Sequence, residues 1–200
     1  PTPSSAASDV YKRQEYIPDA VQSASRALRN KALFFLAYQD GGELAKLQVQ
    51  EALNMTDQLS AFSTLIKHNP TSENINFFYN QWKHERLVID KWFSAQVIMA
   101  HPNYLNKVVK NLTNHRDFSL KTPNRIRSVL GAFSANTAGF HQKNGENYEL
   151  FSDWILKVDP INPQVAARMC SAFETWKRYD VNRQKLIKMQ IDKILEANTI

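Results

Sequence analysis

The sequence predicts an all-α protein, and three observations lead to this fold class. Apolar residues recur at helical spacing along most of the chain, and no segment shows the alternation of apolar and polar residues that marks a half-buried strand. The 200 residues include only 5 Gly and 8 Pro, too few for a turn-rich β architecture. Short breaks marked by Pro and Asn separate the periodic segments. This pattern favours an α-solenoid-like curved array of about nine or ten antiparallel helices.

The helix boundaries follow from local start and stop signals. A Gly-Gly pair ends the first helix, and later helices end where Asn69, His101 or Asp159 precedes a proline, because that position disfavours helical backbone. Asn54 begins the third helix, with Asp57 three residues on in a variant of the capping box. Residues 114–121 and 135–145 are expected to be loops. The predicted helices are residues 21–38, 43–52, 54–68, 72–82, 86–100, 104–112, 122–133, 147–158, 162–176 and 180–197.

The stretch TPNRIRSVLGAF, residues 122–133, has two faces of different character. Thr122 can cap a helix through its hydroxyl, and Pro123 suits the first helical position. The apolar face contains Ile126, Val129, Leu130 and Phe133. The opposite face has small and polar residues, namely Asn124, Ser128 and Gly131. Arg125 flanks this face on one side and Arg127 on the other. Such a helix is suited to form the wall of a cavity, and the alternative is a solvated face with two surface arginines.

Composition and charge indicate which partners and which cellular location to expect for this protein. The formal net charge of +6 could favour nucleic acid, but 19 acidic residues are interleaved with the 25 basic ones and no run of five like charges occurs, so nucleic acid is not an expected partner. Cys170 is the single cysteine, which excludes an internal disulfide and agrees with a cytoplasmic location. No stretch approaches the roughly 18 consecutive apolar residues of a transmembrane helix, so no membrane association is expected.

The N-terminal residues differ in character from the rest. The segment PTPSSAASDVYKRQ, residues 1–14, lacks the apolar region of a signal peptide. We expect residues 1–16 to be a disordered tag or sequence-assembly artefact, and residues 17–200 to form one helical domain.

Six separated segments resemble the C-terminal helical domain of the bacterial aminopeptidase N family, the alanyl aminopeptidase branch of the zinc-dependent gluzincin aminopeptidases. They occur in the family's order and at about its spacing, which is more specific than any single motif. The segments are SRALRNKALFFLA (25–37), NMTD (54–57), LVIDKWFSAQ (87–96), PNRIRSVLGAF (123–133), NPQVAARM (162–169) and KRYDVNRQ (177–184). The resemblance implies a curved, multi-helix lobe of an enzyme that removes N-terminal amino acids from peptides, and this lobe encloses the substrate chamber. It implies as partners the catalytic and N-terminal domains of the same enzyme and a peptide substrate.

A zinc centre is not expected in this chain. The family's H-E-x-x-H motif places two imidazoles on one helix face, where they can share a zinc ion. No two of the five histidines are four residues apart, and His84-Glu85 is followed by Val88 where the second ligand would stand. The family's G-A-M-E-N motif is also missing. We therefore expect no catalytic residue, metal ligand or cofactor in this chain, and no enzymatic activity of the 200 residues alone. Zinc is expected in a catalytic domain outside this chain.

Two arginines are the principal candidates for binding substrate. Arg127 and Arg168 each follow a Pro-initiated helix start by about a turn and a half, and a guanidinium near such an end suits a carboxylate. The resemblance implies that both face the substrate cavity, where they help to hold the far end of a bound peptide or stabilise the closed enzyme. Asn124 and Arg125 are weaker candidates to line the cavity. The alternative is that these residues form structural ion pairs between helices.

Other residues are expected to be structural. The four tryptophans and Cys170 are predicted to pack in the core. Asp90 and Lys91 are expected to form a pair on a helix surface. One continuous core is predicted to contain Ile126, Val129, Phe133, Trp92 and Trp176. A second function remains open from the sequence. It is a stand-alone helical scaffold that binds a protein or nucleic acid partner on a basic concave surface.

Overall fold

The computed structural model describes residues 17 and 19–197, and this part of the chain contains helices and turns without a strand. The all-α prediction is confirmed, whereas the expectation for residues 1–16 lies outside the described residues. The described residues fall into two compact units, which divide between Asn74 and Ile75. None of the described helices combines the length and apolar character needed to cross a membrane.

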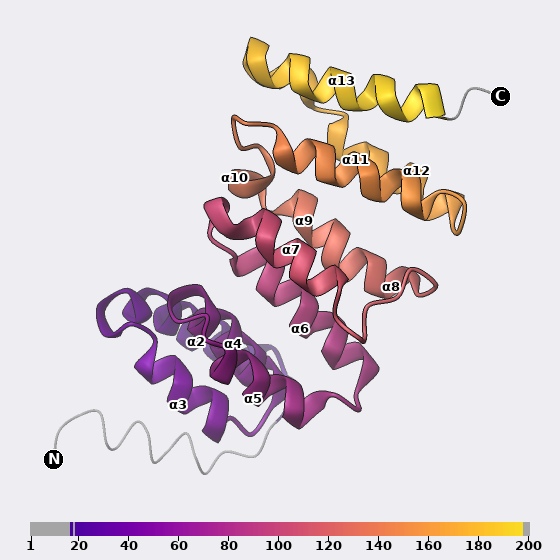
Figure 1. Ribbon diagram of the computed structural model, residues 1–200. Helices are drawn as coiled ribbons and strands as arrows, with labels where there is room; N and C mark the ends of the chain where they lie inside the picture. The colour runs from indigo at the N-terminus through magenta and orange to yellow at the C-terminus, as the bar shows by residue number, and fades with distance from the viewer. Residues whose placement is uncertain (1–16, 18, 198–200) are drawn as a thin grey trace, which may run out of the picture. The chain divides into compact units, whose positions relative to one another are not determined.

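Three mutually packed helices make up most of the first unit (Figure 1). They are α2 (Ala20–Asp40), α3 (Glu43–Glu51) and α4 (Met55–His68), followed by the start of α5 (Ser72–Trp82). The Asp19 side chain caps α2 by accepting from the backbone N–H of Gln22, and Gly41 ends it in the left-handed conformation with φ 67°. The N-cap predicted at α4 is present, since the backbone N–H of Asp57 donates to Asn54 Oδ1 at 2.9 Å. The reciprocal bond of the capping box is replaced, because Asp57 Oδ2 accepts from the Asn54 side-chain amide.

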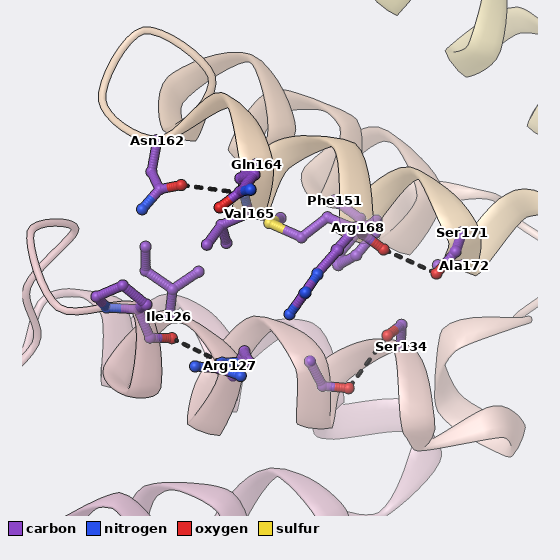
Figure 2. Close-up of a pocket in the computed structure, with 13 residues that line it drawn as sticks. Ile126, Arg127, Ser134, Phe151, Asn162, Gln164, Val165, Arg168, Ser171 and Ala172 are labelled. Carbon is purple, nitrogen blue, oxygen red and sulfur yellow. Dashed lines mark hydrogen bonds between the residues drawn. The ribbon is translucent and has the colours of Figure 1, made fainter.

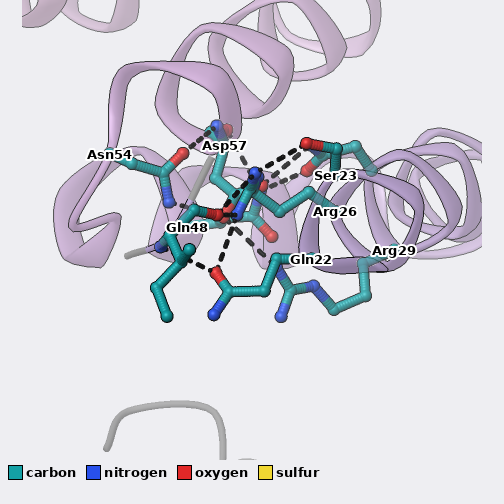
Figure 3. A network of polar contacts seen from close by, with 9 residues as sticks. Gln22, Ser23, Arg26, Arg29, Gln48, Asn54 and Asp57 are labelled. Atoms are coloured by element: carbon teal, nitrogen blue, oxygen red, sulfur yellow. Dashed lines mark hydrogen bonds and ion pairs between the residues drawn. The ribbon is translucent and has the colours of Figure 1, made fainter. Parts of the chain in front are cut away.

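A buried carboxylate ties these three helices together (Figure 3). Asp57 is 1% exposed, and its two oxygens accept from Asn30 Nδ2 at 2.9 Å, Asn54 Nδ2 at 2.9 Å and Arg29 Nη2 at 3.3 Å. Gln48 of α3 donates to the Asn30 side chain and to the Asp57 carbonyl. Hydrogen bonds from several donors offset the cost of burying the charge. The side of α2 that faces α3 and α4 is therefore partly polar.

The second unit contains the remaining helices, several of them shorter than the sequence predicted. Helices α6 and α7, the stretch from α8 to α9, and the group α11 to α13 pack in succession. The elements after α5 are α6 (Arg86–Met99), η1 (Pro102–Tyr104), α7 (Leu105–Thr113), α8 (Pro123–Ile126), η2 (Arg127–Gly131), α9 (Ala132–Ala135), α10 (Thr137–Phe140), α11 (Glu146–Val158), α12 (Pro163–Cys170), η3 (Ser171–Phe173), η4 (Trp176–Arg178) and α13 (Val181–Ala197).

The apolar face predicted for residues 122–133 forms the centre of the second unit. Ile126, Val129, Leu130 and Phe133 are all 0% exposed. Phe133 packs edge-on against Phe140 and Phe151, with ring centroids 5.4 and 5.9 Å apart. Trp92 is also buried, and its indole N–H donates to the Ile75 carbonyl at 3.1 Å.

Several predictions for this unit are wrong. Trp82, Trp154 and Cys170, all expected in the core, are only partly buried. Trp176 is only half-buried, because the helix that starts at Pro163 ends at Cys170 and continues as 3₁₀ turns, in which residues no longer follow the 100° helical spacing. Residues 135–145 are not wholly irregular, since α10 forms there. Asn136 explains this helix: its side-chain oxygen accepts from Gly139 N–H, and its amide nitrogen donates to the carbonyls of Val97 and Ala100 at the end of α6.

Candidate functional site

The candidate site begins with a π-helical turn in the middle of a helical stretch. Helix α8, the turn η2 and α9 follow one another without a break, and the N–H of Ala132 donates to the carbonyl of Arg127, five residues back. Pro123 occupies the first helical position as predicted, but the Thr122 hydroxyl makes no capping bond within the described chain. Such turns occur often at functional sites. Here the turn starts at Arg127.

A pocket of about 500 Å³ opens between this stretch and α12 (Figure 2). Both belong to the second unit. The lining residues are Pro123, Ile126, Arg127, Gly131, Ser134, Phe151, Asn162, Gln164, Val165, Arg168, Met169, Ser171 and Ala172. The pocket thus combines an apolar floor with two guanidinium groups and several uncharged polar side chains.

Arg127 is held in place by its own helix. Its Nη2 donates to Asn124 Oδ1 at 2.8 Å, and its Nε lies 3.4 Å from the Pro123 carbonyl oxygen. Asn124 does not line the pocket, so its contribution is to orient Arg127. The Nη1 group of Arg127 has no hydrogen-bond partner among the described residues, which leaves one arm of the guanidinium available to a ligand.

Arg168 approaches the same pocket from α12. In Figure 2 its side chain reaches across the pocket toward the stretch that carries Arg127 and Ser134. Its guanidinium makes no ion pair or hydrogen bond with any residue that the structure describes. Because α12 has only eight residues, Arg168 lies in its last turn, and the partial positive charge of the helix start is not beside it as the sequence suggested.

The pocket carries uncompensated positive charge. Two arginines line it, and none of its lining residues, all within the described chain, is acidic. A guanidinium without a carboxylate partner retains its full capacity for bidentate hydrogen bonds to an anion. The arrangement is therefore suited to a ligand that has a carboxylate at one end and apolar groups beside it.

Arg125, the fourth predicted residue, lies elsewhere. It is 7% exposed, its Nε donates to Asp90 Oδ1 at 2.6 Å, and its guanidinium carbon lies 4.8 Å from the centre of the Phe93 ring. Asp90 therefore pairs with Arg125 rather than with Lys91. Arg125 is absent from the lining of the large pocket and contributes to a second, smaller one.

Of the small polar face predicted to line a cavity, Gly131 lines the pocket, whereas Ser128 is buried away from it. Ser134 was not predicted, although it follows Arg127 by seven residues, the helical repeat, and this signal could have identified it. Phe151 and Met169 look like ordinary core residues in sequence, so nothing local marks them as pocket residues.

The described residues do not fit a zinc site. Across residues 17 and 19–197, no group of three or more His, Cys, Asp or Glu side chains could hold a metal ion.

A sequence model described as a domain of unknown function (DUF3458_C) with ARM repeats matches residues 4–200. The chain belongs to this family. The ARM-repeat description agrees with the α-solenoid-like array that the helical pattern predicted.

Two curated relatives and one solved structure to which the chain is similar are aminopeptidases. The chain is 35% identical to aminopeptidase N of Escherichia coli over 188 residues, which are 91% of this chain and 22% of that protein. It is 34% identical to aminopeptidase N of Haemophilus influenzae over 175 residues, 86% of this chain and 20% of that protein. The crystal structure of Legionella pneumophila aminopeptidase A in complex with aspartic acid matches with a TM-score of 0.85 and 32% identity, over 94% of this chain and 23% of that one.

These matches confirm the resemblance found in the sequence: the chain is a C-terminal domain of the aminopeptidase N family. It spans about a fifth of the length of the curated relatives it matches.

Proposed function

We propose that the chain is the C-terminal lobe of a zinc-dependent aminopeptidase that removes N-terminal amino acids from peptides. In this proposal the lobe encloses the substrate chamber and has no catalytic centre of its own. One observation carries it: Arg127 and Arg168, on separate elements, line one pocket that contains no carboxylate. A peptide with its N-terminus at the catalytic centre has its own carboxylate at the far end, where such a pocket is useful.

The two arginines would bind that carboxylate differently. Arg127 is already oriented by Asn124, so little side-chain entropy is lost when it binds. Arg168 has no partner to give up, and it can move to complete a fork around the carboxylate. Val165, Ala172 and Met169 would lie against the side chain of the last peptide residue.

The remaining parts of the reaction would come from outside this chain. Zinc and the catalytic residues would belong to the catalytic domain, and the partners of the lobe would be the catalytic and N-terminal domains of the same enzyme. A single cysteine agrees with a cytoplasmic enzyme.

Kinetics on matched substrates tests the proposal. In the full-length enzyme, Arg127→Ala or Arg168→Ala should reduce turnover of a short peptide more than turnover of a single-residue amide, which has no distant carboxylate. The 200-residue chain alone should neither cleave an alanyl or leucyl chromogenic substrate nor bind stoichiometric zinc. Turnover by the isolated chain would contradict the proposal.

A further inference from the structure

A second pocket in the same unit has a different composition. It measures about 180 Å³ and is lined by Lys83, Arg86, Ile89, Asp117, Thr122 and Arg125. Three of these six side chains are basic and one is acidic. The pocket lies beside the first turn of α6 and the segment that enters α8.

Arg125 forms a rigid, buried wall of this pocket. Its Nε is fixed by Asp90, its Nη1 donates to the Asp117 carbonyl at 2.5 Å, and its plane lies over Phe93. Its remaining terminal nitrogen, Nη2, has no hydrogen-bond partner in the described part of the chain. A guanidinium held in this way presents a donor at a fixed position without losing further side-chain entropy.

The two other basic residues lack counterions. Neither Lys83 nor Arg86 makes an ion pair or hydrogen bond with a described residue, and both are exposed at the pocket mouth. The one acidic group at the pocket, Asp117, keeps its negative charge; its Oδ2 accepts from the Tyr79 hydroxyl at 2.6 Å and its Oδ1 lies 3.8 Å from Arg116. The lining therefore has an excess of positive charge.

Two further donors lie beside this pocket. The side chain of Glu85, at the start of the 14-residue helix α6, makes no capping hydrogen bond, so it does not satisfy the backbone N–H groups of the first turn. The Thr122 hydroxyl, which could have capped α8, makes no capping bond within the described chain either.

We propose that this pocket binds a small oxyanion of the phosphate class. Lys83 and Arg86 supply two charges without counterions, and Arg125, which is paired with Asp90, adds a fixed donor. This combination favours a dianion over a single carboxylate, and tetrahedral oxygens can accept from Arg125, Arg86, Lys83 and Thr122. The site is separate from the large pocket, and its existence does not depend on the proposed function.

A titration with inorganic phosphate tests this site in the 200-residue chain. Phosphate is added at constant ionic strength against chloride, and backbone amide NMR signals are followed. We expect saturable shifts concentrated in the first turn of α6 and around Thr122 and Arg125. Phosphate at ten times its Kd should also raise the Tm by roughly 3–6 °C.

Variants separate the pocket from general surface charge. Lys83→Gln and Arg86→Gln remove exposed side chains, so the fold should persist, and each should weaken phosphate binding by about tenfold or more. Lys91→Gln removes the same charge from an exposed position on α6 that does not line the pocket, and should change the affinity less than twofold. Three results would overturn the proposal and show that phosphate binds as an adventitious ion only. They are equal losses of phosphate affinity in all three variants, NMR shifts scattered over the basic surface, and acetate binding as tight as that of phosphate.

Discussion

Arg125 and Asp90 form an ion pair of 2.6 Å with only 9% and 17% of their side chains exposed. The pair joins α8 to α6, and the second arm of the guanidinium holds the carbonyl of Asp117 in the preceding loop. A charge pair shielded from water in this way stabilises little in net terms, but loss of one partner leaves the other uncompensated. The pair therefore fixes the position of the loop that leads into the candidate site.

Replacement of Arg125 by Met should lower the free energy of unfolding by about 3–5 kcal/mol, because Asp90 would remain buried without a partner. Chemical denaturation of the purified chain measures this loss. Arg116→Met provides the control, since Arg116 is 76% exposed and its loss should cost under about 0.5 kcal/mol. A double variant, Arg125→Met with Asp90→Leu, should recover part of the stability. If Arg125→Met lowers the free energy of unfolding no more than Arg116→Met does, the ion pair does not stabilise the packing of α8 on α6.

Gly145 and Gly41 form a matched pair of glycines. Both have positive φ, 74° and 67° respectively, but a Cβ at Gly145 would lie 2.9 Å from Leu186 Cδ1, whereas nothing lies within 4 Å at Gly41. Gly41→Ala should cost about 1 kcal/mol from backbone strain alone. Gly145→Ala should cost about 2–4 kcal/mol, because it also forces α13 away from α11.

A double-mutant cycle checks this explanation. In a Leu186→Ala background, the additional cost of Gly145→Ala should fall toward that of Gly41→Ala, because Cδ1 and Cδ2 are removed and only Cβ, 3.3 Å away, remains. An undiminished cost would mean that Leu186 is not the cause.

His141 makes the stability of the second unit sensitive to pH. Its Nδ1 lies 2.9 Å from the Tyr148 hydroxyl and its Nε2 lies 2.8 Å from the Tyr179 hydroxyl, while Arg183 donates to its carbonyl. Burial, and secondarily the charge of Arg183, lower the pKa of His141 below its usual 6.5. Burial raises the pKa of Tyr148 to about 12, so that hydroxyl stays neutral.

The direction of the pH effect follows from linkage. Between the lowered pKa of folded His141 and 6.5, the unfolded chain binds more protons than the folded one, so stability is fully present above pH 6.5 and is lost as the pH falls through that window. Burial also lowers the pKa of His115, which acts in the same direction. Hydrogen bonds hold the pKa of Asp40 and Asp180 below 3.8, so their effect belongs to more acidic conditions.

Thermal melts at pH 7.5 and 5.5 measure this dependence. The Tm should be lower at pH 5.5, and His141→Gln, which keeps a donor and an acceptor but cannot be protonated, should reduce the difference. A Tm that rises on acidification, or a larger difference in the variant, would exclude this role for His141.

The sequence was sufficient for the features that depend on local pattern. The periodicity of Ile126, Val129 and Phe133 identified a fully buried face, and Asn54 with Asp57 identified a helix start, because each signal operates within one or two turns. The partial burial of Trp176 could not be predicted, since it depends on where α12 changes to 3₁₀ turns.

Contacts between distant segments could not be predicted from the sequence. Arg125 and Asp90 are 35 residues apart, and nothing in either segment specifies the pairing. The large pocket has the same origin: Arg127 and Arg168 come together only because α11 and α12 pack beside the stretch from α8 to α9. The family resemblance gave both arginines as candidates, whereas the apolar floor between them required the structure.

The final prediction concerns the role of Arg127 and Arg168 in the full-length enzyme. Alanine at either position should lower kcat/KM for a short peptide by about ten- to a hundredfold, the loss of one charge-assisted contact of roughly 1.5–3 kcal/mol. Lysine should restore only part of this, because an ammonium cannot reproduce the planar fork. Asn124→Ala should give a smaller loss with Arg127 intact, because it removes only the hydrogen bond that orients that side chain.

Two controls separate substrate binding from structural support. A single-residue amide substrate reports the catalytic centre without the distant carboxylate, so its kcat/KM should change little in all of these variants. A peptide with an amidated C-terminus should lose most of its sensitivity to the arginines, because the charge they bind is gone. Both guanidinium groups are exposed and Arg168 makes no ion pair in the described chain, so the Tm should stay within about 1–2 °C of the unmodified enzyme. Equal losses on peptide, amidated peptide and amide, together with a lower Tm, would falsify the substrate contact and assign both arginines to bracing between helices or domains.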